Sequence, residues 1–537
     1  MSNYIFDAAD SVVTPGKILN AFGETGSGNF VVDAGAFLRS TDDNVAYLGG
    51  TAKWTVTVNG HLATDMLFGP ALVVGGASGS KVTIGEEGSI SNMGDSNGAL
   101  EVDSDSVITN KGIIKSATGN GLGIYSDNTS SLTNSGVIAG FNAALYVQDA
   151  ASFTLTNSGN IFGNLMLSNG ATKLVNTGNI TTSSFYGVLG ATVVFGSGND
   201  TLDNKGLISG YVDLGNGNNI AKSSGQLLGN NGSGVSLISG AGTDKVDILK
   251  GGVVSFGVNL GSGANTFNNA GHVGYDVNHK SFEGGTGVDT VKNTGTFDGG
   301  VDLFGGNDVF TNTGSIGGEI DLGTGDDKFI GGNAAEVVLD NAGKDDYKLG
   351  GGDDWFTAFG GEGFDELTDT VDGGTGVDTY DGSSRFAVYI NMDSADHTSN
   401  GWTGLGSPVL TKSTAVEQEA LKVDNIKNFE NFFGTGNADI FFGNASANGV
   451  IGGGAGDELH GMGGNDKLDG GTGDDYLNGG AGADILIGGT GFDQLDYSAA
   501  SDSGVTKATR DTITDFEVGV DAVHFQGRWL ESLPLSR

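Results

Sequence analysis

Bulky apolar residues recur every nine positions in the C-terminal part of the chain, starting from the unit that begins at Gly434. Each stands eighth in a unit whose first, second and fourth places favour glycine. We interpret the three residues around it as a short strand whose middle side chain points into a core, and the other six as a turn in which glycine permits positive φ. Two units then make one coil. The apolar residues are Phe441, Val450, Leu459, Leu468, Leu477, Leu486 and Leu495.

A looser Asn-x-Gly repeat precedes this array, with most steps between 18 and 28 residues. Apolar residues alternate beside most of these motifs, which is the pattern of short strands joined by turns. Stacked coils of this length bury a core that no single coil could close. The pattern therefore predicts a parallel β-solenoid over residues 81–320, with a meander of hairpins as the alternative. The motif asparagines, expected to form turns or ladders, are Asn92, Asn110, Asn134, Asn157, Asn176, Asn204, Asn269, Asn293 and Asn312.

The sixth place of the nonapeptide is an aspartate in six of seven units, so carboxylates 18 residues apart should stack in two rows. At a spacing of roughly 5 Å they would repel each other unless a cation lay between them. Calcium takes six or more oxygen ligands at roughly 2.3–2.6 Å, and turn carbonyls could supply the remainder, so calcium suits the site better than magnesium. The predicted metal-site residues are Asp439, Asp457, Asp466, Asp475, Asp484, Asp493, Gly461, Gly470, Gly471, Gly473, Gly479, Gly480, Gly482, Gly488, Gly489 and Gly491.

The first units of the array depart from this pattern. Asn448 replaces the aspartate of the second unit, and a site that uses it should be weak or empty. Ala455 stands in the fourth place of the third unit and Met462 in the second place of the fourth, where glycine is expected.

The glycine–aspartate pattern also appears upstream. Between residues 321 and 383 an acidic residue recurs every nine positions from Asp327 to Asp354, and "GGEGFDEL" (Asp365) and "GGTGVDTY" (Asp378) follow out of phase. We predict partial calcium-binding repeats here, with the ligands Asp327, Asp345, Asp354 and Asp378. Still earlier, an Asp or Asn stands four residues before several motif asparagines, at Asp200, Asn265, Asp289 and Asp308.

The charge balance limits the kinds of partner that the protein is expected to bind. The formal net charge is -40, which would repel nucleic-acid phosphates and anionic membranes, so neither is an expected partner. The chain has no cysteine and therefore no disulfide. Its start, "MSNYIFDAAD", lacks the basic and apolar regions of a Sec-type signal, and no apolar run reaches the roughly 18 residues of a membrane span.

The array resembles the GGxGxDxUx repeat of the RTX (repeats-in-toxin, haemolysin-type) calcium-binding family. The resemblance implies a parallel β-roll that is disordered without calcium and folds when calcium binds. The following segment, "DYSAASDSGVTKATRDTITDFEVGVDAVHF", is similar to the one that follows the repeats in secreted serralysin-type metalloproteases. That likeness implies export through a type I secretion apparatus by an uncleaved C-terminal signal, although the end "GRWLESLPLSR" departs from the short hydrophobic run of such signals.

We therefore expect an all-β fold, a parallel β-solenoid that continues into a calcium-binding parallel β-roll. The expected parts are 1–80 as an N-terminal β region or cap, 81–320 as solenoid, 321–383 as partial repeats, 384–433 as an inserted segment, 434–496 as β-roll and 497–537 as C-terminal cap with the secretion signal.

The expected function is that of a secreted calcium-binding protein in adhesion, matrix or surface structure, with a polysaccharide or host surface as a candidate ligand. The alternative is a polysaccharide lyase or uronate epimerase on the solenoid. No HExxH zinc motif is present, so a zinc protease is not indicated. One cluster could serve a lyase or epimerase: His272, His279 and Lys280 with Asp276. An enzyme is therefore the less favoured interpretation.

Overall fold

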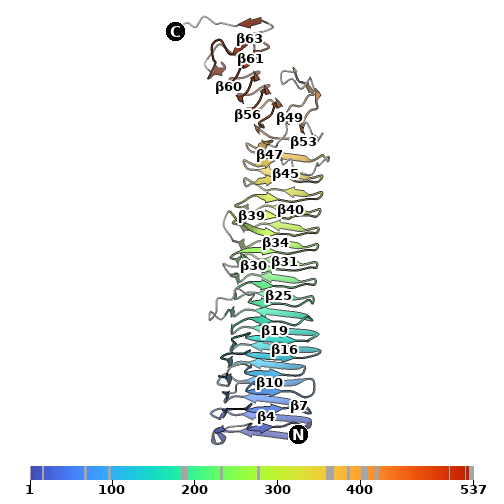
Figure 1. Cartoon of the computed structure of the whole chain (residues 1–537), viewed down its shortest axis with the longest axis vertical. Coiled ribbons are helices and arrows are strands. Elements are labelled where there is room, and N and C mark those ends of the chain that lie inside the picture. The colour runs from blue at the N-terminus through green and yellow to red at the C-terminus, as the bar shows by residue number, and fades with distance from the viewer. Residues whose placement is uncertain are drawn as a thin grey trace. The chain divides into compact units, whose positions relative to one another are not determined.

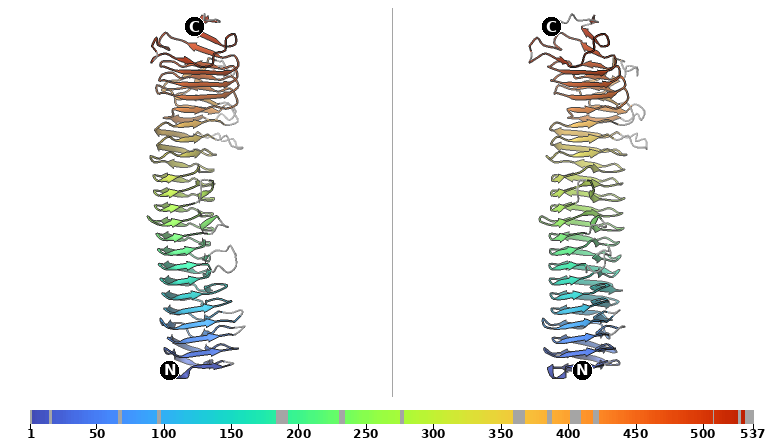
Figure 2. Two further views of the ribbon diagram at one scale, coloured as in Figure 1. Left: turned by 90° about the vertical axis from the view of Figure 1, so that its left-hand side faces the viewer. Right: turned by 60° about the vertical axis from the view of Figure 1, so that its left-hand side comes forward.

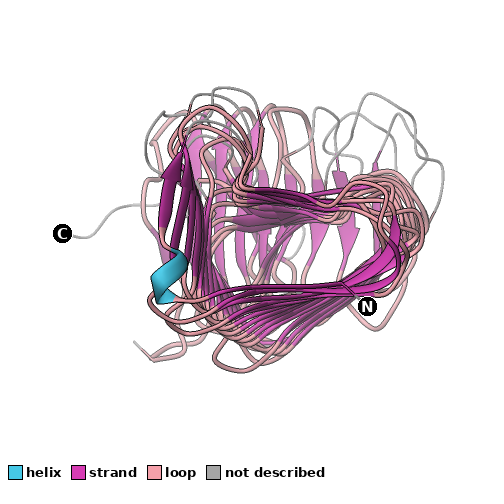
Figure 3. Ribbon diagram, turned by 90° about the horizontal axis from the view of Figure 1, so that it is seen from below, coloured by secondary structure: helices cyan, strands magenta, loops and turns pink. Residues whose placement is uncertain are grey.

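The computed structural model describes residues 2–14, 17–65, 69–94, 98–182, 192–229, 234–274, 278–358, 368–383, 388–400, 409–417, 423–506, 508–525 and 528–530. The chain divides into two compact units. Unit 1 comprises Met1–Gly287 with Thr294–Gly299, and unit 2 comprises Val288–Asn293 with Gly300–Arg537. Each unit is a stack of β-coils, and Figure 3 looks along the coils with strands on the sides and loops at the corners.

Every complete coil of unit 1 contributes one strand to each of three parallel sheets, here called A, B and C (Figure 1). Its sheet A strands are β1 (Ser2–Phe6), β4 (Thr25–Val32), β7 (Thr51–Val58), β10 (Ser80–Ile84), β13 (Ser106–Asn110), β16 (Thr129–Asn134), β19 (Ser152–Asn157), β22 (Ala171–Asn176), β25 (Thr201–Asn204), β28 (Ile220–Ser223), β31 (Lys245–Ile248) and β34 (Thr266–Asn269). Its sheet B strands are β2 (Val12–Thr14), β5 (Phe37–Ser40), β8 (His61–Thr64), β11 (Ser89–Asn92), β14 (Ile113–Ser116), β17 (Val137–Ala139), β20 (Asn160–Phe162), β23 (Asn179–Thr181), β26 (Leu207–Ser209), β29 (Gln226–Leu227), β32 (Val253–Val254), β35 (His272–Val273) and β38 (Thr296–Phe297). Its sheet C strands are β3 (Leu19–Asn20), β6 (Ala46–Leu48), β9 (Leu72–Val74), β12 (Leu100–Val102), β15 (Leu122–Tyr125), β18 (Leu145–Gln148), β21 (Leu165–Met166), β24 (Val193–Val194), β27 (Val212–Asp213), β30 (Val235–Ile238), β33 (Gly257–Asn259) and β36 (Lys280–Glu283).

These coils begin at β1, so residues before 81 take the same three-sheet architecture. β4 pairs in parallel with β7, with Thr25 opposite Thr51, and β7 pairs in the same way with β10. A one-turn 3-10 helix, Ala8–Asp10, is capped by Asp7. Across the described residues, no helix is both long and apolar enough to cross a membrane.

The asparagine motifs build a ladder inside the unit 1 coils. Each side-chain amide donates to the side-chain oxygen of the next asparagine at 2.7–2.9 Å, from Asn110 through Asn134, Asn157 and Asn176 to Asn204. A Cβ on the glycine two residues after each would strike the carbonyl of the preceding coil, as at Gly136 against Gly112. The Asn-x-Gly repeat is therefore structural, as expected.

Unit 2 changes from three-sided to two-sided coils. Among the described residues of unit 2, sheet B has one strand, β41 (Ser315–Ile316). The coil after β41 is 18 residues long, since Lys328 lies opposite Asp346. Its sheet A strands are β37 (Thr290–Asn293), β40 (Val309–Asn312), β43 (Lys328–Ile330), β45 (Asp346–Gly351), β47 (Thr370–Thr375), β49 (Val388–Asn391), β52 (Thr414–Glu417), β53 (Val423–Lys427), β55 (Ile440–Phe442), β57 (Glu458–His460), β59 (Tyr476–Asn478), β61 (Gln494–Tyr497), β63 (Ala522–Phe525) and β64 (Arg528–Leu530). Its sheet C strands are β39 (Gly300–Asp302), β42 (Ile320–Asp321), β44 (Val337–Leu339), β46 (Trp355–Thr357), β48 (Thr379–Asp381), β54 (Asn431–Phe433), β56 (Gly449–Gly454), β58 (Lys467–Thr472), β60 (Ile485–Thr490) and β62 (Thr512–Ile513).

The inserted segment adds strands to one side of unit 2 only. In sheet A the order is β47, β53, β52, β49, β55, with β52 antiparallel to both neighbours, whereas in sheet C β54 alone separates β48 from β56. A further hairpin, β50 (His397–Thr398) with β51 (Val409–Leu410), extends from it. Two extra strands widen that side by about 10 Å. Figure 2 shows the stacked strands from two further sides.

Side chains that point inward form the core of each unit. All seven position-eight residues of the array are buried, as the nine-residue period predicts. Aromatic rings stack along the core, for example Phe267 on Phe282 in unit 1 and Phe432 on Phe441 in unit 2, with centroids 4.5 and 5.3 Å apart. The fold is thus the expected all-β solenoid and β-roll.

Candidate calcium sites

Each position-six aspartate of the array stands just before a strand, alternately of sheet A and sheet C. Strands pair with the strand 18 residues later, with Ile440 opposite Glu458 and Gly449 opposite Lys467. The aspartates therefore form two rows, as predicted. One row is Asp439, Asp457, Asp475 and Asp493, and the other is Asn448, Asp466 and Asp484.

One oxygen of each carboxylate holds the stack together. The backbone N–H of Asp439 donates to Oδ1 of Asp457 at 2.8 Å, and that of Asp457 donates to Oδ1 of Asp475 at 2.7 Å. The second row repeats this contact, as from the N–H of Asp466 to Oδ1 of Asp484 at 2.8 Å. The aspartate is consequently a structural element of the turn as well as a candidate ligand.

The other oxygen has no such contact. Oδ2 is buried and has no hydrogen-bond partner in Asp457, Asp466, Asp475, Asp484 and Asp493. A buried charged oxygen without a partner costs much free energy, so five in two rows call for a cation or for protons.

Position-one glycines make room for that oxygen. A Cβ on the glycine would collide with Oδ2 of the aspartate in the same unit. The pairs are Gly434 with Asp439, Gly452 with Asp457, Gly461 with Asp466, Gly470 with Asp475, Gly479 with Asp484 and Gly488 with Asp493. The donor set of these rows contains only oxygens, which fits calcium.

Burial raises the pKa of every position-six carboxyl of the array, and for most of them neighbouring carboxylates in the row add to the effect. For Asp457, burial acts first and the charges of Asp439 and Asp475 act with it. The pKa rises to about 9 for Asp457, to about 7 for Asp439, Asp466 and Asp475, and to about 6 for Asp484 and Asp493. Without a cation, the folded array therefore resists full ionisation.

Turn positions two and four are crowded and largely left-handed. Positive φ occurs at Gly471, Gly480 and Gly489 in position two and at Gly473 and Gly491 in position four, and Gly482 stands against the carbonyl of Gly464. The two departures keep this backbone, with φ of 65° at Ala455 and 71° at Met462. Such φ values are unfavourable for residues that carry a Cβ.

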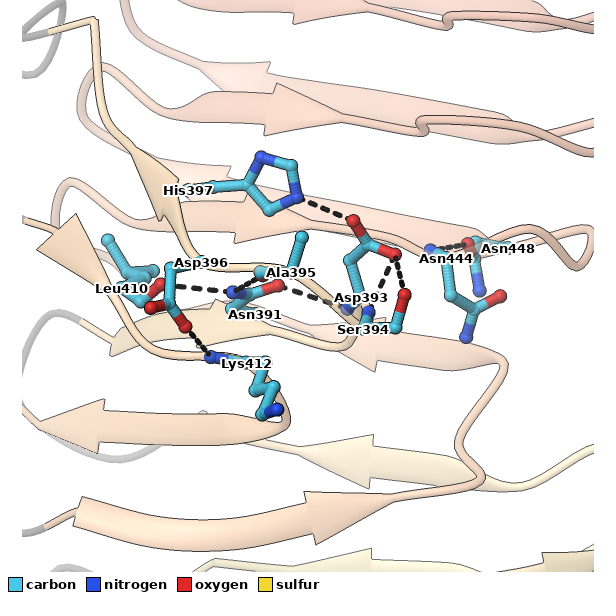
Figure 4. Close-up of polar contacts among 10 residues, drawn as sticks. All are labelled: Asn391, Asp393, Ser394, Ala395, Asp396, His397, Leu410, Lys412, Asn444 and Asn448. Atoms are coloured by element: carbon cyan, nitrogen blue, oxygen red, sulfur yellow. Dashed lines mark hydrogen bonds and ion pairs between the residues drawn. The ribbon is translucent and has the colours of Figure 1, made fainter.

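The Asn448 coil differs from its neighbours. Its Oδ1 accepts the N–H of Asn444 at 3.0 Å (Figure 4), and its Nδ2 donates to the carbonyl oxygen of Glu430 at 3.2 Å. The amide is thus satisfied by protein groups, which supports the prediction of a weak or empty site.

The partial repeats upstream carry the same ladder. The N–H of Asp327 donates to Oδ1 of Asp345 at 2.6 Å, and that of Asp354 to Oδ1 of Asp378 at 2.9 Å. Burial raises the pKa of Asp327 to about 8 and that of Asp378 to about 6, and it also raises the pKa of Asp354. All four predicted residues of this region therefore lie in ladders.

Sequence reasoning missed several rungs of these ladders, three aspartates among them. Asp369 accepts the N–H of Asp345 at 2.7 Å, whereas Asp365, which the motif favoured, lies outside the described residues. After the array, Asp511 accepts the N–H of Asp484 at 2.9 Å and Asp521 that of Asp493 at 3.2 Å. Asp369 stands nine residues before Asp378, and the other two keep an apolar residue two positions later, so the signals were present without the glycines.

Unit 1 contains a ladder of the same kind with mixed rungs. The N–H of Thr172 donates to Asp200, that of Asp200 to Asn219, that of Asn219 to Asp244, and that of Asp244 to Asn265, at 2.6–3.0 Å.

The histidine cluster of the enzyme alternative is spread over two sheets. His272 lies in β35 of sheet B and pairs with Asp298, Nε2 to Oδ2 at 3.0 Å, whereas Lys280 begins β36 of sheet C. Asp276 lies outside the described residues. Nothing in this arrangement favours the lyase or epimerase reading.

The insert is fastened to the array by a buried carboxylate. Glu458 accepts Oγ–H of Ser399 at 2.6 Å and the N–H of Asn400 at 2.8 Å, and it pairs with His460 at 2.9 Å. Burial acts to raise its pKa, but the bonds from His460, Ser399 and Asn400 lower it below the usual range. Within the insert, His397 pairs with Asp393 at 2.6 Å (Figure 4).

Coils whose turns present rows of buried carboxylates define a calcium-binding repeat protein. Residues 460–495 match the RTX calcium-binding nonapeptide repeat, in four copies, and calcium is the ion these repeats bind. No curated protein matches the chain. One similar solved structure is the X-ray crystal structure of a hyperactive, Ca2+-dependent, beta-helical antifreeze protein from an Antarctic bacterium, with 17% identity, a TM-score of 0.26, and coverage of 83% of this chain and 96% of that chain.

Proposed function

We propose that this calcium-binding protein is exported with its roll unfolded and folds when it meets calcium outside the cell. The observation that carries the proposal is the pair of rows of buried Oδ2 atoms without hydrogen-bond partners. The residues proposed to hold calcium are Asp439, Asp457, Asp466, Asp475, Asp484 and Asp493 of the array, with Asp327, Asp345, Asp354 and Asp378 upstream. Bound calcium supplies the positive charge that these carboxylates and the turn carbonyls lack.

Coupling of binding to folding follows from the electrostatics. With a net charge of -40 and buried carboxyls of raised pKa, the calcium-free chain favours expanded states. A ligand that binds only the folded form stabilises it by about 2.7 kcal/mol per site at a hundred times its Kd. Several sites together can therefore switch the roll from unfolded to folded as calcium rises.

The proposed setting is the cell surface or the extracellular space, with type I export. Support comes from the likeness of residues 496–525 to the segment that follows repeats in exported proteases. The polar outer faces of the stacked coils suit a role in adhesion, matrix or surface structure, with a polysaccharide or host surface as the ligand.

The test is a calcium titration of the full chain, followed by far-UV circular dichroism. We expect several ions to bind cooperatively with a gain of β signal. A triple variant, Asp466→Asn, Asp475→Asn and Asp484→Asn, keeps the side-chain shape and should lose most of both. Identical spectra with chelator and with calcium would contradict the proposal.

A further inference from the structure

A second group of carboxylates lies in the core of unit 2, away from the array. Asp340, Asp345 and Asp369 are each at most 3% exposed, and one carboxylate oxygen of each lies within 4.8 Å of those of the other two. Oxygens on opposite sides of a calcium ion are about 4.6–5.2 Å apart, twice the usual ligand distance. The spacing of the three groups therefore matches the span of one ion.

Three separate strands hold these carboxylates in place. Asp340 follows β44, and its N–H donates to the carbonyl oxygen of Thr357 at 2.9 Å. Asp345 precedes β45, and Asp369 precedes β47 and accepts the N–H of Asp345 at 2.7 Å. The group is thus fixed by the backbone of successive coils.

Asp340 is the unusual member of the group. It occupies position one of its nonapeptide, five residues before Asp345, where the complete array units have glycine against the aspartate. In the coils on either side, this position is occupied by the buried apolar residues Leu322 and Ala358. An aspartate here adds a third carboxylate in the place of a hydrogen atom or an apolar side chain.

Two further groups face the cluster. The hydroxyl of Tyr347 donates to Oδ2 of Asp345 at 3.3 Å, and the Tyr347 side chain is 1% exposed. Asp327, one rung away, is 3% exposed, its Oδ2 is buried without a hydrogen-bond partner, and its charge acts on both Asp345 and Tyr347.

Two lysines of these coils pair with a carboxylate outside the cluster. Lys328 and Lys348 pair with Asp346 on the outer face, at 3.3 and 3.4 Å. Buried carboxylates this close cannot all ionise without a compensating charge. A hard cation bound by oxygens alone supplies it.

We propose that Asp340, Asp345 and Asp369 hold one calcium ion in the core of unit 2, with Asp327 adding negative charge beside it. This site has no glycine in position one, and three carboxylates converge on it. Asp345 and Asp327 are also upstream residues of the proposed function, so the proposal rests on it there, but the site shares no residue with the array of 434–496 and either can fail alone.

The first test counts calcium ions per full-length chain by equilibrium dialysis. We expect Asp340→Asn to bind one ion fewer than the unchanged chain. The matched control, Asp346→Asn, removes one charge from the exposed face of the same coil and should leave the count unchanged. An unchanged count for Asp340→Asn would overturn the proposal and mean that the three carboxyls share protons.

Terbium luminescence provides a second test, which does not depend on whether Asp340→Asn folds. Terbium replaces calcium at oxygen sites and emits when a nearby tyrosine is excited. We expect Tyr347→Phe to remove a distinct part of that emission, and Asp475→Asn in the array to leave that part in place. Emission unaffected by Tyr347→Phe would overturn the proposal, whatever happens to the array.

Discussion

The carboxylate ladder of unit 1 and that of the array share one backbone contact and differ in how the second side-chain atom is satisfied. In unit 1, Nδ2 of Asn219 and of Asn265 donates to the carbonyl oxygen of Gly217 and of Gly263, each at 3.2 Å. Oδ2 of Asp244 accepts Oγ–H of Ser239 at 2.6 Å. In the array, the corresponding Oδ2 of Asp457 or Asp475 has no partner.

The difference teaches what calcium does in this fold. An amide nitrogen presents positive hydrogens to the turn carbonyls, as a cation would, so an asparagine rung is complete in the protein alone. An aspartate rung has only acceptors at the same place and needs an ion or a proton. Unit 1 mixes the two kinds of rung, with the buried Oδ2 of Asp200 as its exception, whereas five rungs of the array lack a partner for Oδ2. Dependence on calcium should therefore be much stronger in the array.

The largest expected effect is the response to calcium removal. Hydrogen exchange of the full chain should show loss of amide protection over residues 439–521 on chelation, because the array carboxylates repel each other. Residues 200–265 should lose far less, since their asparagine amides need no ion. Mass spectrometry of peptides from both regions measures this. Equal loss in the two regions would contradict the comparison.

A single substitution should convert a unit 1 rung to the array type. Asn265→Asp replaces the amide that donates to Gly263 with a buried oxygen, and it should destabilise that coil by about 1–3 kcal/mol without calcium. Added calcium should restore part of the loss, measured as amide protection around Asp244. Asn179→Asp, on the exposed outer face of β23, is the control and should change little. A deficit in Asn265→Asp that calcium does not reduce would show that the turn cannot accept an ion.

Acid should partly replace calcium in the array. The position-six carboxyls there have pKa values of about 6 to 9 when folded, against about 3.9 in the unfolded chain. The calcium-free fold thus binds more protons than the unfolded chain, and this contribution to stability is full below about pH 4 and is lost as pH rises through 6 to 9. We expect calcium-depleted protein to retain more far-UV β signal at pH 5 than at pH 8, and to bind calcium more weakly at pH 5. A β signal that falls on acidification would show the sign to be wrong.

The smallest expected effect concerns the turn backbone. Ala455→Gly removes the strain of a φ of 65° and should stabilise the calcium-loaded array by about 1 kcal/mol. Ala481→Gly, in position three, relieves no positive φ and should destabilise slightly. Thermal unfolding in saturating calcium compares the two, and a lower melting temperature for Ala455→Gly would refute the strain argument.

The array could be predicted from sequence because its nine-residue period is visible in the sequence itself. Spacing alone puts Leu468 in the core and Asp466 in a row with Asp484. The coils before residue 81 could not, because the column that later holds Asn110 is filled there by Val32 and Val58, and by Ile84 in the next coil, which carry no motif. Asp369 escaped because its turn lacks the glycine pattern. The choice between amide and ion at each rung depends on contacts of Nδ2 and Oδ2, which no spacing reveals.

The contact from each N–H to the next carboxylate gives the ladder a direction, and the C-terminal segment ends it. Asp511 and Asp521 accept the last N–H groups of the array, while their own N–H groups donate to Oγ of Ser503 and to the carbonyl oxygen of Glu517. No further rung is required beyond them. The number of rungs can therefore grow or shrink upstream of this point, but only in whole coils, which have 18 residues within the array. An insertion or deletion of nine residues would exchange the two rows and place a sheet A strand in sheet C. The number of carboxylate rungs, and with it the capacity for ions, therefore changes by two for each coil.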